Sequence, residues 1–266
     1  MGVSRTQGSW IDSGLELLSW IQDTQEPAIE KASQWCAESI AADSLVHLFG
    51  SGHSRIPVEE MFPRYGSFPG FAPMVELSTT FHTQVAGANG QRQAMFIERT
   101  SGFARVILSN YELTPSDTIM IFSVGGSTAL PLEMAQECKK KGVKVIAVTN
   151  VASGGDLQNN ADLVIDLGVP DGDALIDIPG LLYPVGPGST LSAVAVVNEI
   201  KCRTAKKLLE IGKMLPVLTS ASLIGEEHKN EVFSTAYDEH ARRMSNVLRK
   251  TEQAPYISAQ PEIPQT

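Results

Sequence analysis

Residues 118–150 read TIMIFSVGGSTALPLEMAQECKKKGVKVIAVTN, a segment from which the whole architecture can be inferred. Its two ends, TIMIF (118–122) and KVIAV (144–148), are short apolar runs typical of buried parallel strands. The residues between them have helical spacing, with apolar side chains at Leu130, Met134 and Cys138. A strand, a helix and a second strand within about 30 residues indicate a βαβ unit.

Three runs outside this segment resemble its two strands. They are 45–49 (LVHLF), 163–167 (LVIDL) and, more weakly, 73–77 (PMVEL). Several βαβ units in series build a parallel sheet with helices on both faces. The sequence therefore predicts the α/β class, with a doubly wound, parallel, five-stranded sheet flanked by helices.

Helical segments precede and follow the predicted sheet. Apolar residues recur at helical spacing over 10–42, where Pro27 divides the segment into two helices or begins the second. A long helix is expected after Gly188, and another over 226–250. We therefore divide the chain into a helical extension (1–40), an α/β domain (41–210), a second helical extension (211–250) and a disordered, proline-containing tail (251–266).

The composition argues against several classes of partner. The 266 residues carry 21 Lys and Arg against 30 Asp and Glu, and this formal charge of −9 argues against nucleic-acid binding. The longest uncharged run, 178–198, contains three prolines, so it cannot form a membrane-spanning helix. The three cysteines are odd in number and far apart, and the first residues do not form a secretory signal. We expect a cytoplasmic protein that binds neither a metal nor a membrane.

Two loops rich in glycine and hydroxyl groups follow strands of the predicted sheet. GSGHSR (50–55) comes after the first strand and SVGGST (123–128) after the TIMIF strand, while GST (188–190) opens the long helix. Backbone N–H groups and hydroxyls near helix N-termini can bind an anion without any lysine. The same residue types also form ordinary turns and N-caps, which is the structural alternative for each loop.

A dinucleotide-binding turn is another alternative for the first loop. The pattern G-x-G-x-x-G fits Gly50 and Gly52, but Arg55 stands at the third glycine position. Glu76, in the weak strand, could serve as the ribose-binding acid. This alternative would make the protein a nicotinamide-dependent oxidoreductase.

The segments 49–54 (FGSGHS) and 122–150 together resemble the SIS (sugar isomerase) phosphosugar-binding domain, in which G-x-G-x-S follows the first strand and S-x-S-G-x-T/S precedes a helix. The resemblance covers roughly 40–210 and is nearest to bacterial SIS proteins described only as phosphosugar-binding. It implies a flavodoxin-like fold, a phosphorylated sugar as ligand, no cofactor, and a homodimer or higher oligomer with the site near the interface. The phosphate-binding residues that it implies are Gly52, Ser54, Ser123, Gly125, Gly126, Ser127 and Thr128. Gly125 stands where the family has a second serine, and Ser127 is expected to compensate for it.

An aldose–ketose isomerase needs a group that moves a proton between C1 and C2 of the sugar. Within the SIS family, sedoheptulose-7-phosphate isomerase carries a glutamate in an E-E-L-x-x-R-Y context, which resembles EEMFPRY (59–65) here, although 59–65 lies closer to the first loop. The resemblance thus implies Glu60 as the catalytic base, and His53 is expected to be a general acid or a donor to the anion. The structural alternative for Glu60 is an ion pair with Arg64 at i+4.

Further candidates for the cleft are Ser51, Glu76, His82, Ser189 and Glu199. Glu199 has the structural alternative of an ion pair with Arg203 at i+4. The family's isomerase histidine on the last helix has no counterpart, because Asn198 and Glu199 occupy that region. The expected function is sugar-phosphate isomerisation through an enediol, with a non-catalytic phosphosugar sensor as the main alternative.

Overall fold

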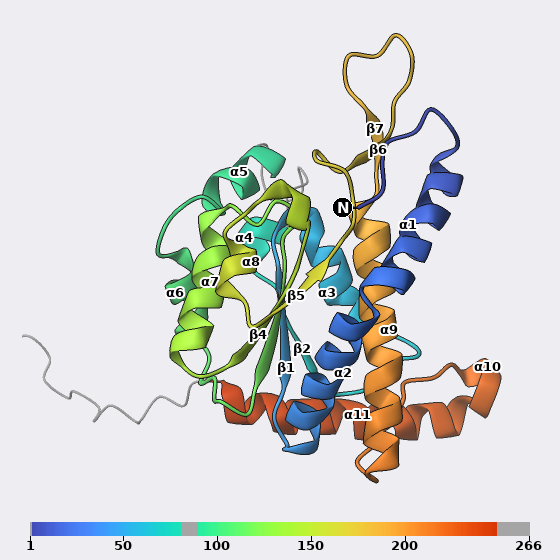
Figure 1. Ribbon diagram of the computed structural model, residues 1–266. Coiled ribbons are helices and arrows are strands. Elements are labelled where there is room, and N and C mark those ends of the chain that lie inside the picture. Colours follow the sequence, from blue (N-terminus) through green and yellow to red (C-terminus); the bar gives the residue numbers. More distant parts are fainter. Residues whose placement is uncertain (1, 81–89, 249–266) are drawn as a thin grey trace, which may run out of the picture.

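A parallel sheet forms the centre of the computed structural model, which describes residues 2–80 and 90–248 (Figure 1). The strands are β1 (Val46–Gly50), β2 (Phe71–Met74), β3 (Thr118–Phe122), β4 (Lys144–Thr149) and β5 (Leu163–Asp166). They lie in the order β2-β1-β3-β4-β5, and every neighbouring pair is parallel. The predicted fold class is confirmed. This order is the flavodoxin-like one and differs from the 3-2-1-4-5-6 order of dinucleotide-binding folds.

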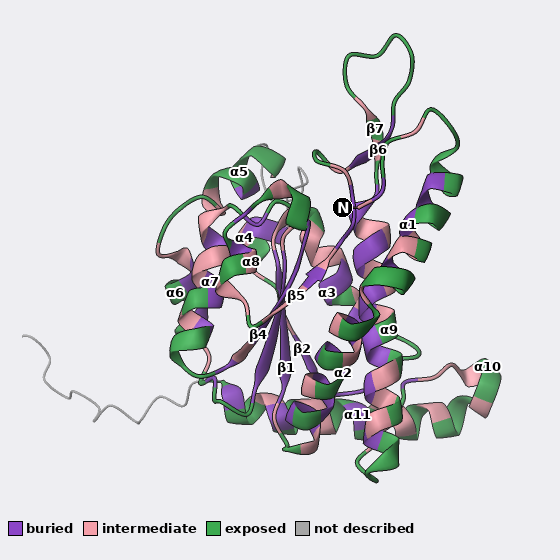
Figure 2. Ribbon diagram, viewed as in Figure 1, coloured by how far each residue is buried: buried purple, intermediate pink, exposed green. Residues whose placement is uncertain are grey.

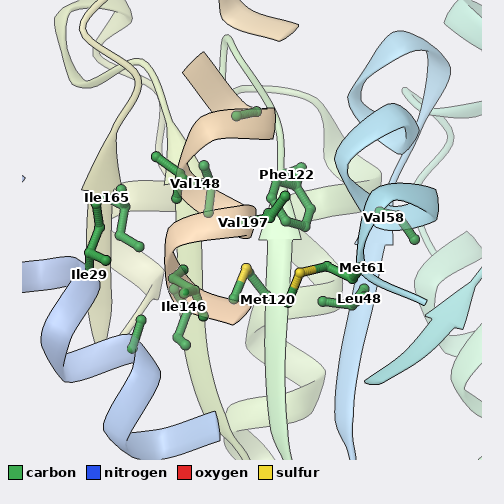
Figure 3. Packing of buried hydrophobic residues seen from close by; sticks show 14 of the residues in the cluster. Ile29, Leu48, Val58, Met61, Met120, Phe122, Ile146, Val148, Ile165 and Val197 are labelled. Atoms are coloured by element: carbon green, nitrogen blue, oxygen red, sulfur yellow. The ribbon is translucent and has the colours of Figure 1, made fainter. Parts of the chain in front are cut away.

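Alternate residues of the strands point to opposite faces of the sheet. In β3, Met120 and Phe122 belong to one buried cluster, whereas Ile119 and Ile121 belong to the other. The first face is covered by α1 (Trp10–Thr24), α2 (Glu26–Ala41), α3 (Ile56–Met61) and α9 (Ser189–Glu210). The second face is covered by α6 (Phe103–Leu108), α7 (Ala129–Lys140) and α8 (Leu157–Asn160). Figure 3 shows α9 crossing the first face, with Val197 over the sheet.

The segments before and after the sheet are largely helical. α1 and α2 are separated at Gln25, and Pro27 stands in the first turn of α2, where its missing N–H is tolerated. α11 (Glu226–Val247), preceded by α10 (Ala221–Ile224), lies across the amino-terminal ends of the strands (Figure 1). Arg243 fastens α11 there by donating to the carbonyl oxygens of Ile40 and Ser44, at 2.9 and 2.8 Å. The tail predicted over 251–266 lies outside the described residues.

The edge strand β2 differs in position from its prediction. The weak run at 73–77 predicts a strand there, but β2 spans Phe71–Met74, and Leu77–Thr80 form the short helix α4. Within the described ranges β2 pairs with β1 alone, and an edge strand tolerates a proline such as Pro73. Phe71, which is fully buried, belongs to the strand although it precedes the predicted run.

A small hairpin of β6 (Ala174–Ile176) and β7 (Val185–Pro187) projects beyond the carboxyl ends of the main strands (Figure 1). Its connecting segment, 177–184, is largely exposed, and Leu182 and Tyr183 expose 84% and 74% of their surface (Figure 2). Among the described residues, no helix combines the length and the apolar character that crossing a membrane requires.

Candidate functional site

The chain leaves two neighbouring strands toward opposite faces of the sheet. β1 continues into the 3₁₀ turn η1 (Gly52–Arg55) and α3 on the first face, whereas β3 continues into α7 on the second. β1 and β3 are paired along their whole length, from Val46↔Thr118 to Gly50↔Phe122. A parallel sheet opens a crevice at such a switch point, outside the carboxyl ends of its strands, and ligands of these folds bind there. The loops 50–55 and 123–128 flank this crevice.

Glycine is required twice in the first loop. A Cβ on Gly50 would lie 2.2 Å from the carbonyl oxygen of Ser54, because the loop folds back against the end of β1. Gly52 has φ +56°, a left-handed conformation that glycine adopts readily. The turn closes where the Ser54 N–H donates to the Ser51 carbonyl oxygen, at 3.1 Å. The result is a tight turn that leaves His53 exposed and Ser54 half-buried.

The second loop folds around the N-terminus of α7. The Gly126 N–H donates to Ser123 Oγ at 3.2 Å, and Ser127 Oγ donates to the Gly125 carbonyl oxygen at 3.0 Å. Thr128 is the N-cap residue of α7, and its side chain makes no capping hydrogen bond. Because Ser123 Oγ accepts a bond here, its own proton can still go to a ligand. The dipole of α7 favours an anion at this end of the helix.

A cavity of ≈ 90 Å³ lies beside the two loops. It is lined by His53 and Ser54 from the first loop, by Ser123 from the second, and by Asp173 and Ser189 from beyond β5. A space of this size holds a small anion or a few water molecules. A sugar attached to such an anion would therefore extend out into the crevice.

Some of the predicted site residues line this cavity, and others do not. Four of the predicted residues line it: His53, Ser54, Ser123 and Ser189. The remaining predicted residues of the two loops lie outside its lining: Ser51, Gly52, Gly125, Gly126, Ser127 and Thr128. Their positions in the same two loops keep them at the crevice.

Asp173 is a lining residue that sequence reasoning missed. Its carboxylate accepts hydrogen bonds from the Ser189 N–H at 2.7 Å, the Ser189 hydroxyl at 2.6 Å and the Gly188 N–H at 3.1 Å. The predicted donors at the start of α9 are thus occupied by an internal carboxylate. Asp173 adopts φ +70°, which aspartate tolerates better than most residues. The only signal in the sequence is a turn-rich PDGD segment, which does not reveal a partner in α9.

Glu60 lies in a different groove, between α3 and α11. That groove has a volume of ≈ 570 Å³ and is lined by Glu60 and Arg64 together with three aromatic residues: Tyr65, Phe233 and Tyr237. Glu60 forms the ion pair with Arg64 and accepts a hydrogen bond from Asn198 Nδ2 at 3.0 Å. Burial raises the pKa of Glu60, but the hydrogen bonds from Asn198 and Arg64 outweigh it, so the pKa is lowered on balance. Glu60 and His53 therefore line separate cavities.

The other predicted acids are also bound elsewhere. Glu199 Oε1 accepts from Arg203 Nε at 2.7 Å, which is the i+4 ion pair. Glu76 follows β2, where its carboxylate accepts from the N–H and the hydroxyl of Ser78 at 3.2 and 2.8 Å. His82 lies in 81–89, outside the described residues.

Glu98 is a second residue that sequence reasoning missed. It follows α5 (Gly90–Ile97), and its Oε2 accepts a hydrogen bond from the Ser51 hydroxyl at 2.8 Å. Its carbonyl oxygen accepts from the Leu130 N–H, in the first turn of α7, at 2.9 Å. A carboxylate therefore lies at the switch point, and its residue's two hydrogen-bond partners, Ser51 and Leu130, are both far from it in sequence. In the part of the chain that is described, His, Cys, Asp and Glu form no group of three that could hold a metal ion.

Known proteins provide an independent comparison. Residues 9–150 match the profile of the SIS domain. A UPF0309 protein from Streptomyces griseus is 30% identical over 252 residues, covering 89% of this chain and 97% of that protein. A UPF0309 protein from Listeria innocua is 26% identical over 241 residues, covering 87% and 95%.

A solved structure has the same fold. The phosphoheptose isomerase of Francisella tularensis superposes with a TM-score of 0.50 at 16% identity, covering 74% of this chain and 95% of that one. The profile match extends over more than half of the chain, and the Streptomyces relative is covered almost completely. The resemblance inferred from the two loops is confirmed, and this chain belongs to the SIS-domain family, together with the UPF0309 proteins.

Proposed function

We propose that this protein binds a phosphorylated sugar in the crevice between the ends of β1 and β3, with the phosphate held by the loops 50–55 and 123–128. The observation that carries the proposal is that two loops rich in glycine and hydroxyl groups meet at the switch point of the sheet. Ser123 offers a hydroxyl proton there, and α7 directs the positive end of its dipole to the same place.

The site would bind phosphate through neutral donors. Arg55, the basic residue of the first loop, donates from Nη1 to both carboxylate oxygens of Glu59, at 2.9 and 3.0 Å, and does not belong to the lining of the ≈ 90 Å³ cavity. Backbone N–H groups and hydroxyls at a helix N-terminus suffice for a phosphate group. Membership of the SIS family supports a sugar phosphate as the ligand, and the phosphoheptose isomerase with this fold acts on such a compound.

Aldose–ketose isomerisation through an enediol is the reaction that such a site would support. His53 lines the cavity, and an imidazole can accept or donate a proton near neutral pH. Glu60, the base that the family resemblance implies, is held by Asn198 and Arg64 in the neighbouring groove. Within one chain His53 is therefore the better placed of the two, and Glu60 could act only from a second copy or after rearrangement.

A non-catalytic phosphosugar sensor is supported by the same observation. Of the two acid–base residues expected from the sequence, His53 lines the cavity and Glu60 does not. A site that holds the sugar phosphate without a paired acid and base would report its presence to another part of the molecule or to a partner.

Proton exchange at C2 of a bound sugar phosphate in deuterated water distinguishes the enzyme from the sensor. An isomerase exchanges this proton even when its product is unknown, and His53→Asn should slow the exchange by about 10²–10⁴-fold. Glu60→Gln is the matched comparison, because an equal loss there would return the role of base to Glu60. If no sugar phosphate that binds undergoes exchange, the sensor function stands.

We also propose that the protein forms a homodimer or a higher oligomer. α1 exposes 66% of Ile11 and 61% of Leu15, and the segment 177–184 of the adjoining hairpin exposes Leu182 and Tyr183. Apolar side chains gathered on one side of a protein mark an interaction surface. Sedimentation at micromolar concentration should give a species of at least twice 28.7 kDa. A monomer that still binds its ligand would contradict this assembly.

A further inference from the structure

Glu98 connects the two sides of the switch-point crevice. Its carboxylate accepts a hydrogen bond from the hydroxyl of Ser51, which directly follows β1, at 2.8 Å. Its carbonyl oxygen accepts from the N–H of Leu130, in the first turn of α7, at 2.9 Å. One residue thus touches the first loop and the helix that follows the second loop. Figure 1 places α5, which ends next to Glu98, over the carboxyl end of the sheet.

The position of Glu98 does not favour helix stability. The Glu98 N–H donates to the Ala94 carbonyl oxygen at 3.0 Å, so that Glu98 directly follows the last turn of α5, which ends at Ile97. The dipole of a helix favours cations in that turn and disfavours a carboxylate. Among the described residues, Glu98 forms no ion pair that would offset its charge. The neutral amide of a glutamine could accept the same Ser51 hydrogen bond, so the negative charge is what distinguishes glutamate from glutamine at this position.

We infer that the Glu98 carboxylate binds a hydroxyl group of the sugar and thereby selects sugar phosphates over bare phosphate. This inference rests on the proposed function. A carboxylate accepts hydrogen bonds from hydroxyl groups and repels a phosphate group, so the Glu98 carboxylate suits the sugar end of the ligand. The phosphate would lie in the ≈ 90 Å³ cavity at the hydroxyls of Ser54 and Ser123. The Asp173 carboxylate, which also lines that cavity, already accepts three hydrogen bonds from Gly188 and Ser189 at the start of α9. The sugar would then extend past Ser51 toward Glu98.

The test compares two probes, inorganic phosphate and a panel of pentose, hexose and heptose phosphates, by titration calorimetry. Glu98→Gln keeps the size and the acceptor oxygen for Ser51 but removes the charge. This substitution should lower the affinity for the most tightly bound sugar phosphate by about 10- to 100-fold, as expected when a hydrogen bond to a charged group is lost. The affinity for inorganic phosphate should stay the same or increase, because the carboxylate no longer repels it.

Two further variants serve as controls. Glu210→Gln removes the same charge from an exposed position at the far end of α9 and should leave both affinities unchanged. Ser51→Ala removes the hydroxyl but leaves the carboxylate. Because Ser51 belongs to the proposed phosphate-binding loop, the affinities for sugar phosphate and for inorganic phosphate should fall together, and their ratio should stay within about threefold. If Ser51→Ala instead reproduces the effect of Glu98→Gln, Glu98 merely positions Ser51, and the inference is wrong.

Other outcomes overturn the inference in distinguishable ways. An equal loss for sugar phosphate and inorganic phosphate in Glu98→Gln would mean that the residue holds the two loops together. If the wild-type protein binds none of the phosphorylated probes, the proposed function fails before Glu98 is tested. Should Glu98→Gln not fold, Glu98→Asp keeps the charge and shortens the side chain. The ratio of sugar-phosphate to inorganic-phosphate affinity must then fall, and an unchanged ratio contradicts the inference.

Discussion

Gly125 and Gly126 are adjacent residues of the second loop, but the backbone requires glycine at only one of the two positions. Gly126 has φ +60°, and a Cβ there would lie 3.0 Å from Thr149 Oγ1 and 3.3 Å from Leu157 Cβ. Gly125 does not have a positive φ, and a Cβ there would meet nothing within 4 Å. The backbone therefore requires glycine at 126, whereas at 125 it accepts the serine that the SIS pattern has.

This difference gives a prediction for two neighbouring substitutions. Gly126→Ala should lower the free energy of unfolding by about 1–2 kcal/mol, because an L-residue is strained in the left-handed region. Gly125→Ser should leave stability nearly unchanged and add a hydroxyl donor, strengthening sugar-phosphate binding by about 1 kcal/mol. Urea denaturation and calorimetry measure the two effects. A Gly125→Ser protein that is as unstable as Gly126→Ala would contradict the described backbone.

At the scale of the element, α9 depends on a residue outside it. Asp173 accepts from the N–H groups of Gly188 and Ser189 and from the Ser189 hydroxyl, and so performs the function of an N-cap from a distant turn. Asp173→Ala should lower the free energy of unfolding by about 1–2 kcal/mol, the usual effect of losing a cap. Asp173→Asn keeps an acceptor and tolerates φ +70°, so it should lose less.

The control for this prediction lies two residues away. Asp171 is exposed, and its side chain does not cap α9. Asp171→Ala should therefore leave the urea midpoint nearly unchanged. An equal shift in Asp171→Ala and Asp173→Ala would mean that α9 does not depend on this cap.

Most helices and strands could be predicted from the sequence, because the patterns that indicate them lie within short segments of the chain. The buried runs at 118–122 and 144–148 became β3 and β4, and the glycines after β1 and β3 marked the two loops. The observed β2 begins two residues earlier than the predicted strand. It includes the fully buried Phe71, and as an edge strand it tolerates Pro73 in its interior. The order of the strands, and with it the switch point, depends on contacts between distant segments, so the local patterns alone do not predict it.

The residues of the site were harder to predict, because their contacts join distant parts of the chain. Glu98 bonds to Ser51 across 47 positions, and Asp173 bonds to Ser189 across 16. Glu60 was placed at the site by a local resemblance, yet Asn198, 138 positions away, helps to hold it in another groove. No periodicity or motif encodes such pairings, so a single sequence identifies the loops and misses the carboxylates beside them.

At the scale of the whole molecule, the three cysteines test the packing. Cys36 and Cys138 are buried on opposite faces of the sheet, and burial raises the pKa of each thiol to about 12. Cys202 is exposed on α9. Because the thiolate is the reactive form, a thiol reagent at pH 8 should label Cys202 alone in the native protein and all three cysteines in urea. Rapid native labelling of Cys36 or Cys138 would contradict the described core.

The central claim is that the crevice between β1 and β3 binds a sugar through its phosphate. Titration calorimetry of the wild-type chain with sugar phosphates and with their unphosphorylated parents tests it most directly, with Ser123→Ala and Thr128→Ala as matched variants. We predict binding of at least one sugar phosphate, no binding of its parent sugar at the same concentration, and a loss of about 1.5–3 kcal/mol in each variant. Equal binding of the parent sugar, or unchanged binding in both variants, would contradict the claim.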